Sequence, residues 1–177
     1  MVEQAKARFR REGLDVPVST RTWRELASRA VERYDVVLCV GNSIVHTQNA
    51  HAMSEALRGL GEVTRPGGHV ILDSRNWEKL HRDHQVVQVS DRPITRQGLR
   101  CLAVYAWEFP VAFEDEHVAH LLLLFDHGER VEQHHHIIRF RPFRYTDLEE
   151  RIEHAGLTVV DTDFVEGADR YSVVARR

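Results

Sequence analysis

Three consecutive histidines, His134 to His136, are an obvious candidate for metal binding in this sequence. If the run lies on a strand, His134 and His136 share one face about 6.6 to 6.8 Å apart, and two imidazoles at that spacing can bind one metal ion. A third ligand would have to come from His120 or His127. No carboxylate or cysteine around them has a recognised metal-ligand pattern, and exposed strands often alternate polar residues. A histidine metal site is therefore one alternative among others.

Other polar side chains follow two short apolar runs. The first run, at 34–41, reads YDVVLCVG and leads into the polar segment Asn42 to His46. The second, His69 to Asp73, reads HVILD and continues through Ser74 to Arg75. Near-continuous apolar runs of this kind predict parallel strands buried on both faces, and ligands of open α/β sheets bind at the carboxyl ends of such strands. The polar residues are therefore candidates for a binding site, although Asn and Ser also form turns.

A helix is predicted between these two strands. Apolar residues recur at helical spacing from about Asn49 to Leu60, and Gly61 marks the expected end of the helix. The sequence Arg-Pro-Gly-Gly at 65–68 predicts a tight turn before the second strand. Strand, polar loop, helix, turn and strand form a βαβ unit, which places the chain in the α/β class.

The remaining segments extend this unit in both directions. Helical patterns cover Met1 to about Gly13, Thr22 to about Val31 and Tyr145 to Ala155, and an extended piece lies at 14–19. Thr22 and Glu25 have the spacing of a capping box. Long strand-like stretches at 100–109, 117–125 and 130–140, with a turn at 126–129, predict an antiparallel section, and 158–164 with 170–175 predict a terminal hairpin.

Composition limits the classes of function. The chain has 177 residues, 42% of them hydrophobic and 29% charged, which is typical of one soluble globular domain. Its net charge of -3 leaves no basic surplus for nucleic acid or an anionic membrane. Cys39 and Cys101 form neither a metal pair nor a disulfide framework, which predicts two reduced thiols. No apolar stretch approaches the roughly 18 residues of a membrane span and no signal-peptide segment is visible, so we expect a cytoplasmic protein.

Three motifs together resemble the class I S-adenosylmethionine-dependent methyltransferases. They are CVGNSIVH at 39–46, RPGG at 65–68 and LDSRNW at 72–77, and they are most similar to the glycine and sarcosine N-methyltransferase branch. GNSxxH followed about thirty residues later by DxRNW is the specific part, whereas RPGG occurs in many helix-to-strand turns. The resemblance is good over residues 34–80 and loose elsewhere. It implies a single domain, 1–177, with a partial Rossmann-like methyltransferase sheet and an antiparallel insertion, 99–141, over the substrate pocket.

The resemblance also implies S-adenosylmethionine as the cofactor. Thr22, Trp23, Val40 and His46 match positions that contact the cofactor in the family. The indole face of Trp23 would offer adenine a stacking surface. The ordinary alternative is that Trp23 is a core residue of an amphipathic helix.

Two residues match positions that meet the substrate in the family. Asn42 corresponds to a position that contacts the amino-acid substrate, and Arg75 to one that binds its carboxylate. A guanidinium can bind a carboxylate through two parallel hydrogen bonds, which a lysine cannot do. The ordinary alternative for Arg75 is a surface ion pair with Asp73 or Glu78. The resemblance assigns no catalytic residue and no metal.

The sequence departs from the family pattern in two ways. Trp77 replaces a tyrosine, and Thr22-Trp23 replaces an asparagine-tryptophan pair. The family's first strand, glycine-rich turn and second strand should precede the first helix, yet the sequence contains no GxGxxG-like turn. We therefore expect a sheet without its first two strands, an uncovered edge on the strand at 36–41, and weak binding of S-adenosylmethionine. The segment 14–19 should lie detached or fill the gap.

The sequence thus predicts N-methylation of a small amine or amino acid, such as glycine or sarcosine, with S-adenosylmethionine. Such a transfer depends mainly on positioning and needs no general base if the amine arrives neutral. A homo-oligomer is compatible with the sequence. The alternatives are a truncated, inactive domain that serves as a binding or dimerisation module, and a histidine-metal β protein. On the first interpretation, Trp23, Asn42, His46 and Arg75 should converge on one cleft at the carboxyl ends of the parallel strands.

Overall fold

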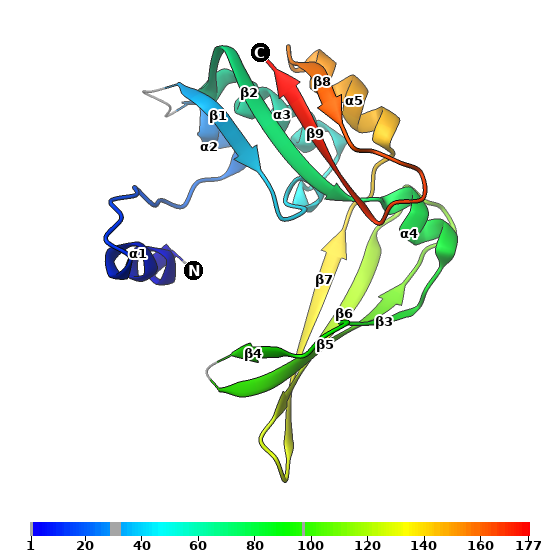
Figure 1. The fold of residues 1–177 in the computed structure, drawn as a ribbon. Coiled ribbons are helices and arrows are strands. Elements are labelled where there is room, and N and C mark those ends of the chain that lie inside the picture. Colours follow the sequence, from blue (N-terminus) through cyan, green and yellow to red (C-terminus); the bar gives the residue numbers. More distant parts are fainter. Residues whose placement is uncertain (1, 29–32, 97) are drawn as a thin grey trace.

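The computed structural model describes residues 2–28, 33–96 and 98–177. Its elements in chain order are α1 (Val2–Arg11), α2 (Trp23–Ser28), β1 (Tyr34–Cys39), the 3-10 helix η1 (Ile44–His46), α3 (Ala50–Val63), β2 (Thr64–Arg75), α4 (Trp77–Asp83), β3 (Val87–Val89), β4 (Ile94–Arg96), β5 (Leu99–Glu108), β6 (His117–Asp126), β7 (Val131–Phe140), α5 (Tyr145–His154), β8 (Thr158–Thr162) and β9 (Arg170–Arg176). They form a mixed sheet and an antiparallel sheet that extends away from it (Figure 1). The predicted α/β class is confirmed.

The mixed sheet contains the predicted βαβ unit. Its strand order is β1-β2-β9-β8, with β1 parallel to β2 and the other pairs antiparallel. α3 connects the two parallel strands and, with α5, lies behind the sheet in Figure 1. Apolar side chains of α3, β2 and α5 form the core between these layers, among them Leu57, Leu72 and Ile152, which are almost fully buried. The predicted terminal hairpin, β8–β9, is confirmed as well.

β1 is exposed on one face, so the prediction of a strand buried on both faces is wrong. Val36 and Leu38 are 50% and 62% exposed, whereas Cys39 on the other face is 4% exposed. Successive side chains of a strand point to opposite faces of the sheet. An apolar run is therefore buried on both faces only where other elements cover both faces of the sheet. β1 is also the edge of its sheet among the described residues, pairing with β2 alone. This uncovered edge matches the expectation from sequence.

The connection from α3 to β2 differs from the prediction. α3 does not end at Gly61 but continues to Val63, because Gly61 does not adopt the positive φ of a glycine that ends a helix. The RPGG sequence at 65–68 forms an irregularity within β2 rather than a separate turn, since the register shifts there opposite β1. Gly67 has a φ of +78°, a value that favours glycine.

The antiparallel sheet begins earlier than predicted. Its order is β3-β5-β6-β7, with β4 also paired to β5, so it starts at Val87 rather than at residue 99. The strands β3 and β4 have three residues each, too few to show a period of two. An aromatic cluster joins the two sheets: the Trp77 ring lies 5.1 Å from that of Phe140 and 6.4 Å from that of Trp107, centroid to centroid.

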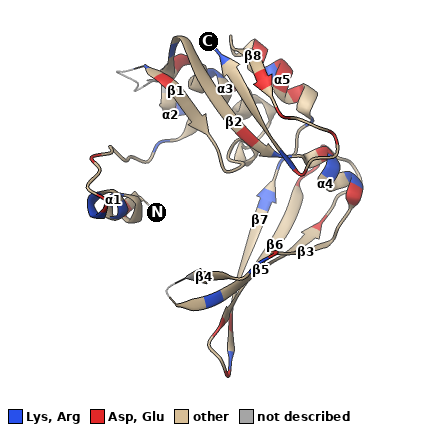
Figure 2. Ribbon diagram, viewed as in Figure 1, with Lys and Arg blue, Asp and Glu red and all other residues tan. Residues whose placement is uncertain are grey.

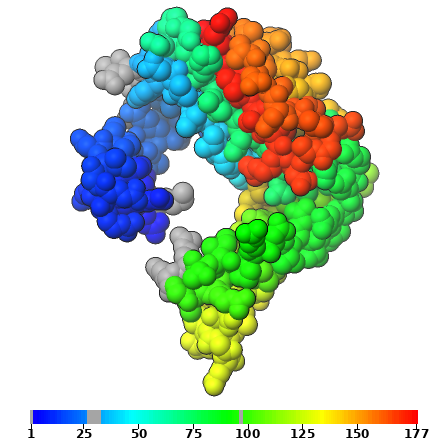
Figure 3. Space-filling view, in the orientation of Figure 1, coloured from blue at the N-terminus to red at the C-terminus, as the bar shows by residue number. Residues whose placement is uncertain are grey.

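The N-terminal segment lies apart from both sheets. Residues 14–21 form no strand, and Leu14 and Val16 are exposed, which is the detached arrangement of the two expected. In Figure 3 a hollow separates α1, in dark blue, from the two sheets.

Residues of both charge signs are mixed along α4 and α5 (Figure 2). Within the described part of the chain, no helix is long and apolar enough to cross a membrane.

Both cysteines are free and buried. Burial, and secondarily the charge of Asp73, raises the pKa of the Cys39 thiol to about 12. A thiol with such a pKa stays protonated at neutral pH and is a poor nucleophile. Both residues therefore serve as small apolar core residues, and the prediction of two unpaired thiols is confirmed.

Candidate functional site

The loop after β1 is shaped for close contact with the end of β2. Gly41 and Asn42 have φ angles of +79° and +60°, so two successive residues adopt the left-handed conformation that glycine and asparagine tolerate best. The Asn42 backbone N–H donates a 2.6 Å hydrogen bond to Oδ1 of Asp73. Asp73 thus fixes the loop beside the carboxyl end of β2, instead of pairing with Arg75.

Asn42 is buried and holds the main chain of β2. Its Oδ1 accepts hydrogen bonds from the backbone N–H of Arg75, at 3.0 Å, and from the hydroxyl of Ser74, at 3.3 Å. The two predicted substrate residues, Asn42 and Arg75, therefore lie together at the same end of the sheet. The contact joins the side chain of one to the backbone of the other, which leaves the Arg75 guanidinium available for other partners.

The Arg75 guanidinium projects toward the antiparallel sheet. Its Nη1 donates to Oε1 of Gln88 at 3.2 Å, and its Cζ lies 5.4 Å from the centroid of the Trp107 ring. No carboxylate of the described residues lies within ion-pair distance of Arg75. Burial, followed by the nearby charge of Arg170, lowers the pKa of Arg75 below its ordinary value. A half-buried cation without a counter-ion is a suitable group for binding an anion.

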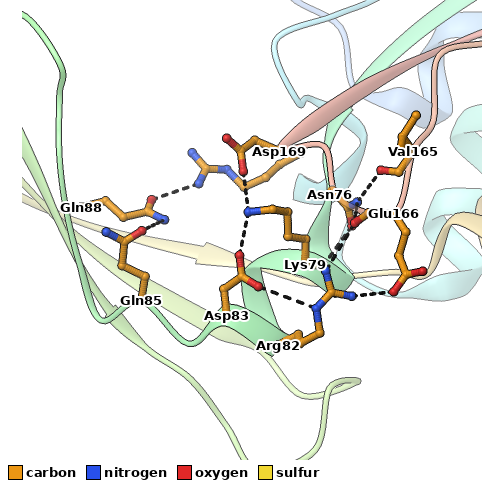
Figure 4. A network of polar contacts seen from close by, with 10 residues as sticks. Asn76, Lys79, Arg82, Asp83, Gln85, Gln88, Val165, Glu166 and Asp169 are labelled. Atoms are coloured by element: carbon orange, nitrogen blue, oxygen red, sulfur yellow. Dashed lines mark hydrogen bonds and ion pairs between the residues drawn. The ribbon is translucent and has the colours of Figure 1, made fainter.

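A polar cavity of about 330 Å³ surrounds this guanidinium. It is lined by residues of β2, α4, β3, the following loop and the start of β9: Arg75, Asn76, Lys79, Leu80, Asp83, Gln85, Gln88, Val89, Asp91, Asp169 and Arg170. Lys79 lies between Asp83 and Asp169, with Nζ–O distances of 2.6 and 2.9 Å (Figure 4). Each of these two acids therefore already has a cation partner in Lys79. Arg170 in turn has Asp73 within 3.5 Å, which leaves Arg75 as the cation without a paired acid in the described lining.

A second cavity, of about 570 Å³, contains three of the four predicted cofactor residues. Thr22, Trp23 and His46 line it with Arg21, Arg24, Thr47, Gln48, Asn49, His51, Ala52 and Glu55. Trp23 begins α2 and packs partly against the core. The predicted capping box positions it: the Thr22 N–H donates to the Glu25 carboxylate at 3.1 Å, and the Glu25 N–H donates back to Oγ1 of Thr22 at 3.3 Å. The part of this helix predicted beyond residue 28 includes positions outside the described residues.

The site residues predicted from sequence therefore lie in two places rather than in one cleft. The two cavities share no lining residue, and Arg75 lines the first while Trp23 and His46 line the second. Val40 lines neither; its side chain is 49% exposed, and its carbonyl oxygen accepts a 2.7 Å hydrogen bond from the Ser43 hydroxyl. The loop from Val40 to His46 connects the two regions along the chain.

Sequence reasoning missed three residues that surround Arg75. Gln88 lies on the three-residue strand β3, Trp107 on β5 and Arg170 at the start of β9. No linear motif contains them, because they come from three separate parts of the chain. Only the pairing of β3 with β5 and of β2 with β9 brings them to Arg75.

The histidines of β6 and β7 do not form the metal site considered from the sequence. His134 and His127 both contact the Glu132 carboxylate, at 2.7 and 3.0 Å. His120 instead contacts His135, at 2.9 Å between ring nitrogens, and the alternation of a strand places His135 on the opposite face from His134. Within residues 2–28, 33–96 and 98–177, no group of three or more His, Cys, Asp or Glu side chains could hold a metal ion. The described residues therefore offer no support for the histidine-metal alternative.

Part of the chain is similar to known methyltransferases in sequence. No protein-family model matches it. A stretch of 58 residues is 33% identical to a protein named glycine/sarcosine N-methyltransferase from Aphanothece halophytica, and 34% identical to one of the same name from Halorhodospira halochloris. The matched stretch is 33% of this chain but only 22% of the length of each relative.

Solved structures show the fold over nearly the whole chain. An S-adenosylmethionine-dependent methyltransferase from Clostridium acetobutylicum aligns with 98% of this chain at a TM-score of 0.77 and 15% identity. The methyltransferase CcbJ from Streptomyces caelestis aligns with 99% at a TM-score of 0.76 and 17% identity. This chain covers 70% and 75% of those two structures. It therefore has the fold of these methyltransferases over the part that it shares with them, and the resemblance inferred from sequence is confirmed.

Proposed function

We propose that this chain takes part in S-adenosylmethionine-dependent N-methylation of a small amine or amino acid such as glycine or sarcosine. The observation that carries the proposal is the half-buried Arg75 guanidinium, which has no carboxylate partner among the described residues and stands at the carboxyl end of β2 beside Asn42. An amino-acid acceptor would supply the carboxylate that this cation lacks. The names of the two relatives similar in sequence support the same substrate class.

The two cavities suit different parts of such a reaction. The larger one, at about 570 Å³, is within the usual size range of small-ligand sites, and the Trp23 indole there could stack on adenine. When bound, S-adenosylmethionine would supply a methyl group on a positively charged sulfur. Thr22, Trp23 and His46 are the described residues that would hold its adenosyl part. The sequence offers no glycine-rich turn for the rest of the cofactor.

The contribution of the chain's own residues is positioning. Arg75 would hold the acceptor by its carboxylate, and Asn42 would keep the end of β2 in place through the Arg75 backbone. Methyl transfer is an in-line displacement, so fixing the acceptor amine accounts for most of the catalysis. An acceptor amine that arrives neutral requires no protein base, because the transfer leaves the positive charge on the product amine.

Substitution of Arg75 by lysine tests the proposal. Arg75→Lys keeps the charge but removes the planar fork, so glycine binding should weaken by about tenfold while S-adenosylmethionine binding stays unchanged. Isothermal titration calorimetry with each ligand measures both effects. Arg65→Lys is the matched control, because Arg65 lies on the same strand as Arg75 but away from the cavity, where it forms an exposed ion pair with Asp35 of β1. Equal losses for both ligands would show that Arg75 is structural and would reject the proposal.

A second candidate function is a binding module without activity. The exposed apolar face of β1, with Val36 and Leu38 at least half exposed, favours it, since surfaces of this kind often mark contacts with other polypeptides. The same titrations separate the two candidates. A chain that binds neither glycine nor S-adenosylmethionine would favour the module over the enzyme.

A further inference from the structure

The side-chain oxygen of Gln88 is the point at which Arg75 meets the antiparallel sheet. Gln88 Oε1 accepts a hydrogen bond from Nη1 of Arg75 and another from the indole Nε1 of Trp107, each at 3.2 Å. Both partners are donors only, so the atom between them must be the oxygen of the amide and not its nitrogen. The amide nitrogen is directed to Oε1 of Gln85, at 3.5 Å. The orientation of Gln88 is therefore determined by its neighbours, of which Figure 4 labels Gln85.

Trp107 gives this arrangement a rigid base. Its side chain is 3% exposed and packs against Tyr105, Phe109 and Phe140, while the guanidinium of Arg75 lies over its ring. β3, which carries Gln88, pairs directly with β5, which carries Trp107. One ring thus supports Arg75 from its face and orients Gln88 through its N–H. Cation–π contacts of this kind strengthen when the cation is partly removed from water.

The arrangement uses one side of the guanidinium and leaves the rest. Gln88 takes one N–H of Nη1, and the described residues take no other N–H of this group. A neutral amide acceptor orients the guanidinium without neutralising it, whereas a glutamate at the same place would satisfy the charge internally. The cation is therefore fixed in position and still able to bind a carboxylate.

We infer that Gln88, oriented by Trp107, is a positioning residue that holds the Arg75 guanidinium for the carboxylate of a small ligand, so that the antiparallel sheet sets the affinity for that ligand. This inference rests on the proposed function for the identity of the ligand as an amino-acid acceptor. Gln88 does not touch the reacting atoms; it acts through Arg75. Its neutrality is as important as its hydrogen bond.

Two substitutions separate these properties. Gln88→Leu removes the acceptor at similar size, and Gln88→Glu keeps an acceptor but supplies a competing negative charge. The full 177-residue chain would be titrated by NMR with glycine, with glycinamide, which has the same amine but no carboxylate, and with acetate. Gln133→Leu is the matched control, since Gln133 is an exposed glutamine of β7 in the same sheet and lines neither cavity.

We expect Gln88→Leu to weaken glycine and acetate binding about tenfold, the loss that corresponds to one hydrogen bond to a charged group. Gln88→Glu should weaken both further, because its carboxylate competes with theirs. Glycinamide binding should change in neither variant, and Gln133→Leu should leave all three ligands unaffected. The indole N–H resonance of Trp107, assigned with Trp107→Phe, should shift in Gln88→Leu and remain in place in Gln133→Leu.

The outcomes distinguish this inference from the proposed function. Glycine affinity that is the same in the original chain and both Gln88 variants would overturn the inference and leave the proposed function standing. Acetate binding that depends on Gln88, without any glycine binding, would reject the amino-acid acceptor and support the positioning role. No binding of either carboxylate to the original chain would overturn both.

Discussion

Asn42 combines an unusual backbone conformation with two hydrogen bonds to the end of β2. Asn42→Ala removes the acceptor for the Arg75 N–H. It also puts at a φ of +60° an alanine, which lacks the polar side chain that lets asparagine tolerate this region. We expect the free energy of unfolding to fall by about 2 to 4 kcal/mol. Asn42→Gly relieves the backbone conformation and loses only the hydrogen bonds, so it should cost about 1 to 3 kcal/mol. Urea unfolding measures both, and an unchanged stability in Asn42→Ala would contradict the structural role.

A buried histidine makes stability depend on pH. His117 is fully buried, and its Nδ1 lies 3.0 Å from the carbonyl oxygen of Asp115. A carbonyl only accepts, so Nδ1 carries the proton and Nε2 accepts from Nδ1 of His81, also at 3.0 Å. Burial is the main cause that lowers the pKa of His117 from its ordinary value of 6.5. The folded chain therefore holds this ring neutral.

The direction of the effect follows from proton linkage. Below pH 6.5 the unfolded chain protonates this ring while the folded chain does not, so its contribution to stability is complete above that pH and declines as the pH falls toward the folded pKa. The loss is at most about 1.4 kcal/mol per pH unit. Urea unfolding between pH 5 and 8 should show a steeper decline in the original chain than in His117→Phe, which cannot titrate. Parallel curves would disprove the assignment.

At the scale of elements, the irregularity in β2 requires a glycine. A Cβ at Gly68 would lie 2.8 Å from the carbonyl oxygen of Asp35, a contact with backbone that cannot be relieved by a side-chain rotation. We expect Gly68→Ala to lower the free energy of unfolding by about 1 to 3 kcal/mol. Gly167→Ala is the matched control, because nothing lies within 4 Å of a Cβ there and its φ is not positive. That control should change stability by less than about 0.5 kcal/mol.

At the scale of the whole molecule, the exposed face of β1 should govern self-association. Leu38 is 62% exposed, whereas Val37, on the other face of the same strand, packs against the core. Leu38→Lys should reduce aggregation in static light scattering and leave the free energy of unfolding within about 0.5 kcal/mol of that of the original chain. Val37→Lys should destabilise the fold instead, because it buries a charge. If Leu38→Lys aggregates as readily as the original chain, this surface is not the cause.

Local patterns in the sequence determined most of the fold. The βαβ unit, the three long antiparallel strands, the capping box at Thr22 and the terminal hairpin all follow from apolar periodicity and turn chemistry, which act between residues close in the chain. The motif at 39–46 likewise resembled the methyltransferases, and this resemblance was visible from sequence because the motif is one continuous segment at the end of a strand. The expected edge at β1 followed from the same motif order.

Tertiary structure alone decided the environment of Arg75 and the exposure of β1. Sequence spacing placed Asn42 and Arg75 at one end of the sheet, but the pairing of β3 with β5 and the hydrogen bonds of Gln88 depend on register between distant segments. The apolar run of β1 could not reveal which of its faces would lack a covering element. The spacing of apolar residues shows which face of a segment can be buried. The contacts that the segment makes depend on which other segments fold against it.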